Sequence, residues 1–160
     1  MRAVLDGARL VLQIDIGFGD AVTPDAQQVT YPTLLADVPA PTLRVYPKAT
    51  VVAEKLHAVT VLGMTNTRMK DFFDLWVLLR DNTIDDVELR RANEATFARR
   101  QTVLPRAQPM GLSDAFFEDA MKQVQWRAFL KKNKLEPLDL STVVQYVRER
   151  ARQVGFARTY

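Results

Sequence analysis

Residues 46–80 read YPKATVVAEKLHAVTVLGMTNTRMKDFFDLWVLLR and contain two consecutive helical patterns, each with charged residues where a purely structural helix would carry apolar ones. At about 100° per residue, the apolar residues of 50–62 share one arc of a helix, and Lys55 lies in the middle of that arc. A lysine there must extend its ammonium to solvent, pair with a buried carboxylate, or face a polar pocket that admits an anion. The pattern leaves all three open.

The second pattern runs from Arg68 to Arg80, after three residues whose side-chain oxygens could cap a helix. It is apolar almost all round, which predicts a core helix. Asp71 and Asp74 share one face, and Lys70 and Asp74 are spaced to form an ion pair. One interpretation is that ion pair plus an acid that favours the helix N-terminus. The other is a cluster of carboxylates and lysine facing a cleft, as in phosphate and metal sites.

The composition is that of a soluble globular domain, with 48% hydrophobic and 26% charged residues among 160. There is no long apolar run and no signal-peptide pattern, so no membrane span or secretory leader is expected, and a cytoplasmic location is predicted. The absence of cysteine excludes disulfides, thiolate catalysis and cysteine-ligated metals. The one histidine, His57, excludes a histidine-rich metal site and is expected to be exposed or to cap a helix.

The charge of the chain is mildly basic, with a net charge of +3 and a pI of about 9.3. This balance permits a polyanionic partner without requiring one. Arginines gather between Arg90 and Arg106, and lysines gather between Lys131 and Lys134. Such runs are most often solvated faces, so charge alone does not identify a nucleic-acid-binding protein.

The N-terminal residues predict a small sheet. Residues 9–20, RLVLQIDIGFGD, alternate as a strand with one buried face, and residues 43–46 form a second short strand. Between them we expect an irregular connection with an extended piece at 30–35. Asp15 lies on the opposite face of the first strand beside two glycines, which favours a ligand for a cation, with a solvated acid as the alternative.

The rest of the sequence predicts five helices. They span 50–62, 68–80, from 85 or 86 to 99, 114–132 and 141–153, with Thr50 and Ser113 as candidate N-caps. Few strands followed by many helices indicate an α+β chain in which helices predominate. We divide it into a sheet remnant at 1–46 and a helical region at 47–160.

Three ordered segments resemble a known family. LQIDIGFGD, then YPKATVVAEKLHAVTVLG, then NTRMKDFFDLWVL are similar to the AbiEii/AbiGii-type nucleotidyltransferase toxins of bacterial type IV toxin–antitoxin and abortive-infection systems. The similarity continues through ATFARRQTVLP and WRAFLKKN, and so covers nearly the whole chain. It implies a small, incomplete sheet like that of the polymerase β-type nucleotidyltransferases, followed by a helical C-terminal region.

The resemblance also implies roles for individual residues. Carboxylates of such enzymes hold Mg²⁺ on a nucleoside triphosphate, and a nucleotide moves to an acceptor such as tRNA while pyrophosphate leaves. Asp15 would correspond to a strand acid at the metal, Lys55 of the AEKL motif would contact phosphate, and Lys70 would be a second nucleotide-binding residue. Asp71 and Asp74 of the RxKDxxD motif would accept the proton of the acceptor or hold Lys55 in place. A cognate antitoxin protein is a further implied partner.

One motif of the family is not found. A Gly-Ser turn with paired strand acids should precede Asp15 by many tens of residues, but only fourteen residues stand before it. We therefore expect an N-terminally truncated protein that is inactive by itself. The alternative is a non-catalytic helical module that binds the antitoxin or RNA. A third possibility is a structural fragment that self-associates through an exposed sheet edge.

Overall fold

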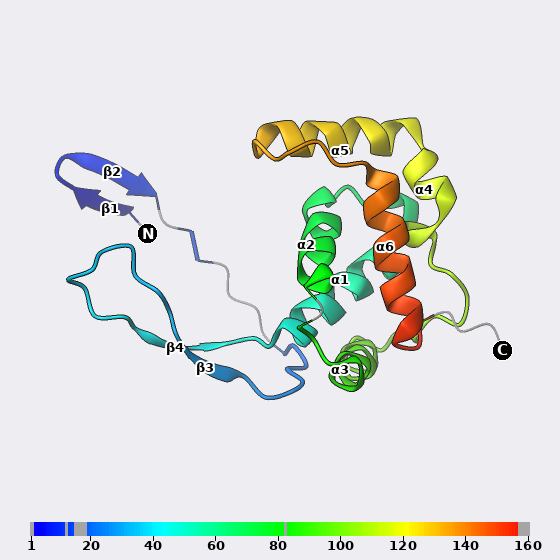
Figure 1. The fold of residues 1–160 in the computed structure, drawn as a ribbon, viewed down its shortest axis with the longest axis horizontal. Coiled ribbons are helices and arrows are strands. Elements are labelled where there is room, and N and C mark those ends of the chain that lie inside the picture. Colours follow the sequence, from blue (N-terminus) through cyan, green and yellow to red (C-terminus); the bar gives the residue numbers. More distant parts are fainter. Residues whose placement is uncertain (1, 12, 15–18, 82, 157–160) are drawn as a thin grey trace.

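The computed structural model of this chain describes residues 2–11, 13–14, 19–81 and 83–156. It is mixed α+β, as the sequence predicts, with four short strands followed by helices. Figure 1 shows the helices gathered into one body and the strands lying to one side of it. The sheet is therefore peripheral, and helices build the core.

The strands form two separate antiparallel hairpins in the part of the chain that the structure describes. β1 (Arg2–Leu5) pairs with β2 (Ala8–Val11) through a turn in which Asp6 and Gly7 have φ of 46° and 79°. Left-handed conformations at both central residues suit a tight two-residue hairpin turn, and Asp-Gly is a common pair there. β3 (Gln27–Thr30) pairs with β4 (Thr42–Val45), with Thr30 opposite Thr42.

Three expectations for the strands need correction. The predicted strand at 9–20 is confirmed only as β2, since 13 and 14 lie outside any strand. Ile14, expected on a buried face, is 66% exposed. The extended piece lies at Gln27–Thr30 and not at 30–35, while the second predicted strand is confirmed as β4 within one residue. Among the described residues of this segment and its partner strand, Val4 and Val11 are also exposed, so the alternating pattern does not mark a buried face there.

Helices account for most of the remaining chain. In the described residues there are six α-helices and two short 3-10 turns: α1 (Lys48–Leu62), η1 (Gly63–Thr65), α2 (Met69–Arg80), α3 (Asp86–Arg99), η2 (Met110–Leu112), α4 (Asp114–Glu118), α5 (Ala120–Lys132) and α6 (Leu140–Gln153). The helices α1, α2, α3 and α6 agree with predicted helices within two residues at each end.

Two details of the helices differ from the prediction. Thr50 does not cap α1, which begins at Lys48 after Pro47. Its hydroxyl instead accepts a hydrogen bond from the Thr23 amide (3.0 Å) and donates one to the Thr23 carbonyl (2.9 Å). The predicted helix at 114–132 is interrupted by Asp119, whose extended backbone ends α4 and whose carboxylate caps α5. Ser113 caps α4, as predicted.

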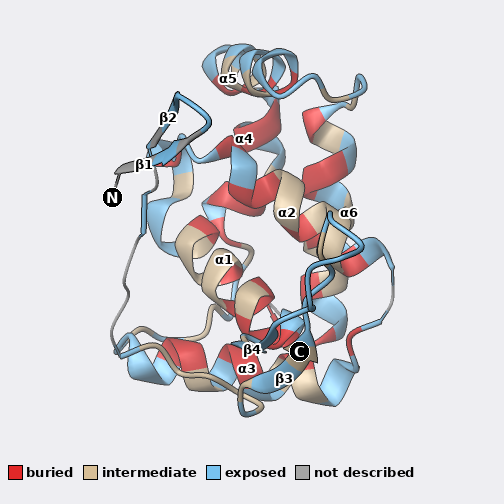
Figure 2. Cartoon of the chain, turned by 90° about the vertical axis from the view of Figure 1, so that its left-hand side faces the viewer, coloured by how far each residue is buried: buried red, intermediate tan, exposed pale blue. Residues whose placement is uncertain are grey.

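Among the described residues, the hydrophobic core is formed by the helices and by the turns that connect or follow them. α1 packs against α2 and α3, and α2 packs against α6. Figure 2 shows buried residues on the helices and mostly exposed ones on the hairpins. In the part of the chain that the structure describes, the buried apolar side chains lie between Pro47 and Phe156. No helix in the described chain is long and apolar enough to cross a membrane.

Candidate functional site

Lys55 lies between the two acids that the sequence singled out. Its Nζ is 2.9 Å from Oδ1 of Asp71 and 2.7 Å from Oδ2 of Asp74. The two acids are three residues apart on α2, so they share the helix face that meets α1. The side chain of Asp71 is 4% exposed, that of Lys55 17% and that of Asp74 22%. This is a partly buried ion-pair network that joins α1 to α2.

Each carboxylate also contacts a second cation. Nε of Arg68 lies 2.7 Å from Oδ2 of Asp71, although no hydrogen bond is made to that oxygen, so the contact is one between charges. Lys70 donates a hydrogen bond to Oδ2 of Asp74 across one turn of α2, which confirms the predicted pairing. The cluster thus contains three cations and two carboxylates, and carries an excess of positive charge.

These contacts favour the ionised forms of Lys55 and Asp74. Burial disfavours the charged form of Lys55, but hydrogen bonds to Asp74 and Asp71 and their negative charges outweigh it and raise the pKa of Lys55. Burial likewise disfavours ionised Asp74, but hydrogen bonds from Lys55 and Lys70 prevail and lower the pKa of Asp74. A carboxylate with a lowered pKa is a weak base, which suits an anchor better than a proton acceptor.

A cleft of about 420 Å³ opens beside this cluster, along α1. Its lining combines three cations, two acids and a tyrosine with smaller groups, contributed by Asp20, Tyr46, Thr50, Val51, Glu54, Lys55, His57, Ala58, Arg68 and Arg100. Lys55 and Arg68 therefore reach both the ion-pair network and open space. Such an arrangement can bind a phosphate group, since two cations converge on one hollow.

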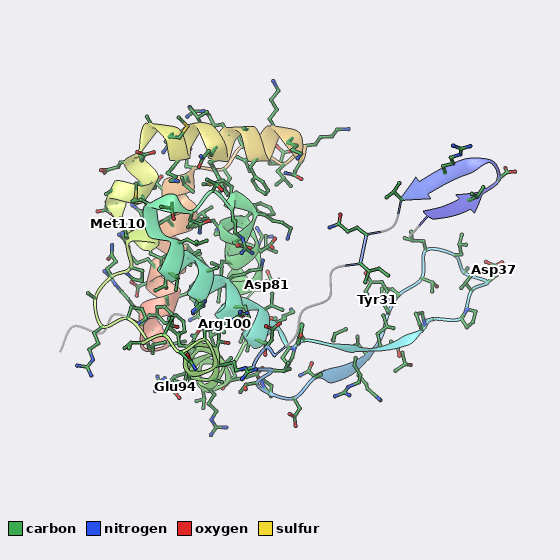
Figure 3. The ribbon with its side chains drawn as sticks, turned by 180° about the vertical axis from the view of Figure 1, so that it is seen from behind. Tyr31, Asp37, Asp81, Glu94, Arg100 and Met110 are labelled. Atoms are coloured by element: carbon green, nitrogen blue, oxygen red, sulfur yellow. The ribbon has the colours of Figure 1, made fainter. Side chains whose placement is uncertain are left out.

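The other side of the cleft is built around Arg100. Its Nη2 lies 2.8 Å from Oε2 of Glu54 and 3.0 Å from Oδ1 of Asp20. The neighbouring Arg99 donates to the carbonyl of Gly19 at 2.5 Å. These contacts attach residues 19–20 to the helical body, and Figure 3 shows Arg100 where the chain from the hairpins meets the helices. Arg99 and Arg100, predicted to belong to a solvated basic run, are thus engaged within the molecule.

His57 differs from its prediction. It is half-buried, its ring contacts Phe97 edge to face at 4.9 Å, and its Nε2 lies 2.9 Å from Oγ1 of Thr102. Burial lowers the pKa of His57 below its usual value, the negative charge of Glu54 opposes this with a smaller effect, and the positive charge of Arg100 lowers the pKa further. The residue is therefore a neutral part of the cleft wall, neither exposed nor a cap.

The structure brings together four of the five predicted site residues: Lys55, Lys70, Asp71 and Asp74. Asp15, the predicted metal ligand, lies outside the described residues. Within the described ranges, no three His, Cys, Asp or Glu side chains gather as a metal site would require. Sequence reasoning missed Asp20, Glu54 and Arg100, because their contacts join segments far apart in the chain. Arg68 could have been found, since it precedes Asp71 by three residues.

Comparison with known proteins identifies one family. The family described as "Nucleotidyl transferase AbiEii toxin, Type IV TA system" matches residues 1–152. No curated protein and no solved structure matches the chain. The polymerase β-like arrangement implied by the sequence resemblance therefore stays a prediction.

Proposed function

The chain belongs to the AbiEii family of nucleotidyl transferase toxins of type IV toxin–antitoxin systems, and from this premise we propose that the cleft along α1 binds the phosphates of a nucleoside triphosphate. Membership of the family implies a nucleotide substrate and an antitoxin partner. The observation that carries the proposal is the position of Lys55, a partly buried cation that lines the cleft while two carboxylates hold its ammonium.

The geometry of Lys55 supports a phosphate-contacting role. An ammonium has three N–H donors, and Asp71 and Asp74 accept two, which leaves one for a phosphate oxygen. Two anchored contacts fix the position of Nζ, so little side-chain freedom remains to be lost when phosphate binds. Arg68 lines the same cleft and adds a second positive charge.

In the proposed reaction, a hydroxyl oxygen of the acceptor forms a bond to the α-phosphorus of the triphosphate. The bond between that phosphorus and the bridging oxygen of the β-phosphate breaks, and pyrophosphate leaves with the electron pair. The proton of the acceptor hydroxyl passes to solvent water. Lys55 and Arg68 stabilise the negative charge that develops on the phosphates. Asp71 and Asp74 orient Lys55, and the lowered pKa of Asp74 favours this over proton removal.

Mg²⁺ is the metal that we propose accompanies the nucleotide. Asp71 and Asp74 both hold Lys55, while Oε2 of Glu54 and Oδ1 of Asp20 contact Arg100. Glu54 also lines the cleft, and its second oxygen, Oε1, is buried with no hydrogen-bond partner. Mg²⁺ is usually held by one or two carboxylates together with phosphates and water. Glu54, with Asp20 beside it, fits such a site and would hold the ion, which would neutralise phosphate charge. Asp15 remains a candidate ligand.

The acceptor, which we propose is an RNA such as tRNA, would approach from the α5 side of the cleft. Arg99 and Arg100 of the 90–106 run are exposed but already contact Gly19 and Asp20. Lys131 and Lys132 at the end of α5 are also exposed, and Lys132 lines a hollow between α2 and α5 that shares Arg68 with the cleft. Exposed cations beside the site suit an RNA backbone.

The proposal is tested by titrating the Mg²⁺ complexes of ATP, GTP, CTP and UTP separately into the chain by calorimetry. We expect one or more to bind, and Lys55→Ala to weaken that binding at least tenfold, as loss of about 1.4 kcal/mol would do. Lys48→Ala is the matched control, since Lys48 lies on the same helix but points to Thr83. The proposal would be contradicted if none of the four triphosphates binds, or if Lys55→Ala and Lys48→Ala weaken the binding equally.

A second candidate is a non-catalytic module that binds the antitoxin or RNA. It is favoured by the fact that Lys55 already has two carboxylate partners, as a structural ion pair would. Exposed apolar side chains on the β3–β4 hairpin, among them Tyr31, Leu34 and Leu35, offer a surface for a protein. This candidate predicts partner binding that is indifferent to Lys55→Ala, together with no triphosphate binding.

A further inference from the structure

Lys122 on α5 is a buried cation for which the described structure shows no carboxylate partner. It is 5% exposed, its Nζ donates a 2.8 Å hydrogen bond to the carbonyl of Asn66, and it lies 5.4 Å from the ring centroid of Phe116. Burying an ammonium is costly unless its charge is compensated. Neither a carbonyl nor a phenyl ring carries a full negative charge, so an apolar side chain would suit this position better if packing were the only requirement.

The residue that Lys122 contacts is itself fully buried. Asn66 lies in the short connection between η1 and α2, and its side-chain Oδ1 accepts a 2.8 Å hydrogen bond from the amide of Arg68. Its backbone carbonyl faces Lys122, while its backbone amide donates to Gly63. Asn66 therefore joins α5 to the first residues of α2.

From Arg68 the contacts continue to the cleft. Arg68 is paired with Asp71, which holds Lys55, and Arg68 lines both the cleft and the hollow between α2 and α5. A connected series of polar contacts thus runs from the interior of α5 to the ammonium of Lys55. Movement of the η1–α2 connection would displace Arg68 and the start of α2 together.

We propose that Lys122 and Asn66 are positioning residues, which fix the η1–α2 connection so that Arg68 and Asp71 are correctly placed at the cleft. The structural part of this inference stands on the contacts alone. Its consequence for binding rests on the proposed function. Lys122 touches no substrate in this scheme and acts through Asn66 and Arg68.

The test compares Lys122→Met with Lys131→Met, an identical change at an exposed position of the same helix. Amide hydrogen exchange, read residue by residue by NMR, should show exchange at Arg68 and Asp71 at least tenfold faster in Lys122→Met and unchanged in Lys131→Met, with α6 as an internal reference. The tightest of the four Mg²⁺–nucleoside triphosphates should bind about tenfold more weakly to Lys122→Met, and Arg68→Ala combined with Lys122→Met should bind no worse than Arg68→Ala alone.

Asn66 supplies a second pair of variants in case Lys122→Met does not fold. Asn66→Ala removes the oxygen that accepts from the Arg68 amide, and Asn66→Ser returns an acceptor, so exchange at Arg68 should accelerate in the first and recover in the second. If exchange at Arg68 is unchanged in Lys122→Met and Asn66→Ala, the positioning role is wrong. If exchange accelerates but wild-type chain binds no triphosphate, the positioning role holds and the proposed function fails. A lowered melting temperature with unaltered exchange and affinity would mean that Lys122 only stabilises the fold.

Discussion

At the scale of single residues, Asp74 shows how the ion-pair network should respond to pH. The carboxylate accepts from Lys55 and Lys70, which lowers its pKa in the folded chain relative to the unfolded one. Such a group contributes stability above its unfolded pKa of about 3.9, and that contribution is lost as pH falls through the lower folded value. The pKa of Lys55 is raised, so its contribution to stability has the opposite pH dependence and is lost only as pH rises above about 10.5.

The prediction is that Asp74→Asn is less stable than wild type by about 1 to 2 kcal/mol at pH 7, because two lysines lose their charged partner. The difference should shrink as pH falls below about 4, because the unfolded chain then binds a proton at Asp74 that the folded chain takes up only at a lower pH. Urea unfolding at pH 7, 5, 4 and 3 measures it. Asp37→Asn, in the exposed loop between β3 and β4, is the control. A difference that does not vary with pH would show that the charge of Asp74 does not stabilise the fold.

At the scale of elements, the sequence predicted a helix boundary correctly where a capping side chain was recognisable. The start of α3 was predicted at residue 85 or 86, and the carboxylate of Asp85 accepts hydrogen bonds from the amides of Val87 and Glu88. The break at Asp119 was missed, since the apolar periodicity on either side continues through it. The contacts of Lys55 with Asp71 and Asp74 could be proposed but not located, because helical spacing within one segment says nothing of how two helices face each other.

The interruption between α4 and α5 leads to a prediction for Asp119. Its Oδ1 accepts a 2.9 Å hydrogen bond from the amide of Lys122, so this acid caps the helix that carries Lys122. We expect Asp119→Ala to lower the free energy of unfolding by about 1 kcal/mol. The neighbouring Glu118→Ala, at an exposed position, should change it by less than about 0.5 kcal/mol. Equal losses in the two variants, measured by urea unfolding, would mean that the cap contributes nothing.

At the scale of the whole molecule, the sheet and the helices contribute unequally to stability. Every buried apolar side chain among the described residues lies at position 47 or beyond. The contacts between 1–46 and the helices include those of Thr23 with Thr50, Gly19 with Arg99 and Asp20 with Arg100. These are polar contacts, two of them largely exposed, and exposed ion pairs add little. The division at residue 46, first inferred from the order of the predicted strands and helices, can therefore be tested by asking whether residues 47–160 fold as a unit.

The prediction is that a chain of residues 47–160 folds by itself and loses about 1 to 2 kcal/mol relative to residues 1–160, the amount expected for a few surface hydrogen bonds. Trp76 and Trp126 both lie in the shorter chain, so tryptophan fluorescence follows urea unfolding of both chains equally. The dependence of the unfolding free energy on urea should be nearly unchanged, since it scales with the surface exposed on unfolding and the removed residues bury little. A chain of residues 19–160 is the control, because it retains the contacts of Gly19, Asp20 and Thr23 and should match residues 1–160.

Light scattering on the same three chains tests the proposal that the hairpins promote self-association. Among the described residues, β3 and β4 form a two-stranded sheet whose outer edges pair with no other strand. Exposed apolar side chains lie in the loop between them, at Leu34 and Leu35, and on β4, at Leu43. Unpaired edges and exposed apolar groups favour pairing with another chain. Residues 1–160 should therefore associate at concentrations where residues 47–160 are monomeric.

The unfolding experiment also tests the boundary itself. If residues 19–160 unfold cooperatively but residues 47–160 do not, the segment at 19–46 belongs to the folded unit, and the boundary must be placed before Gly19.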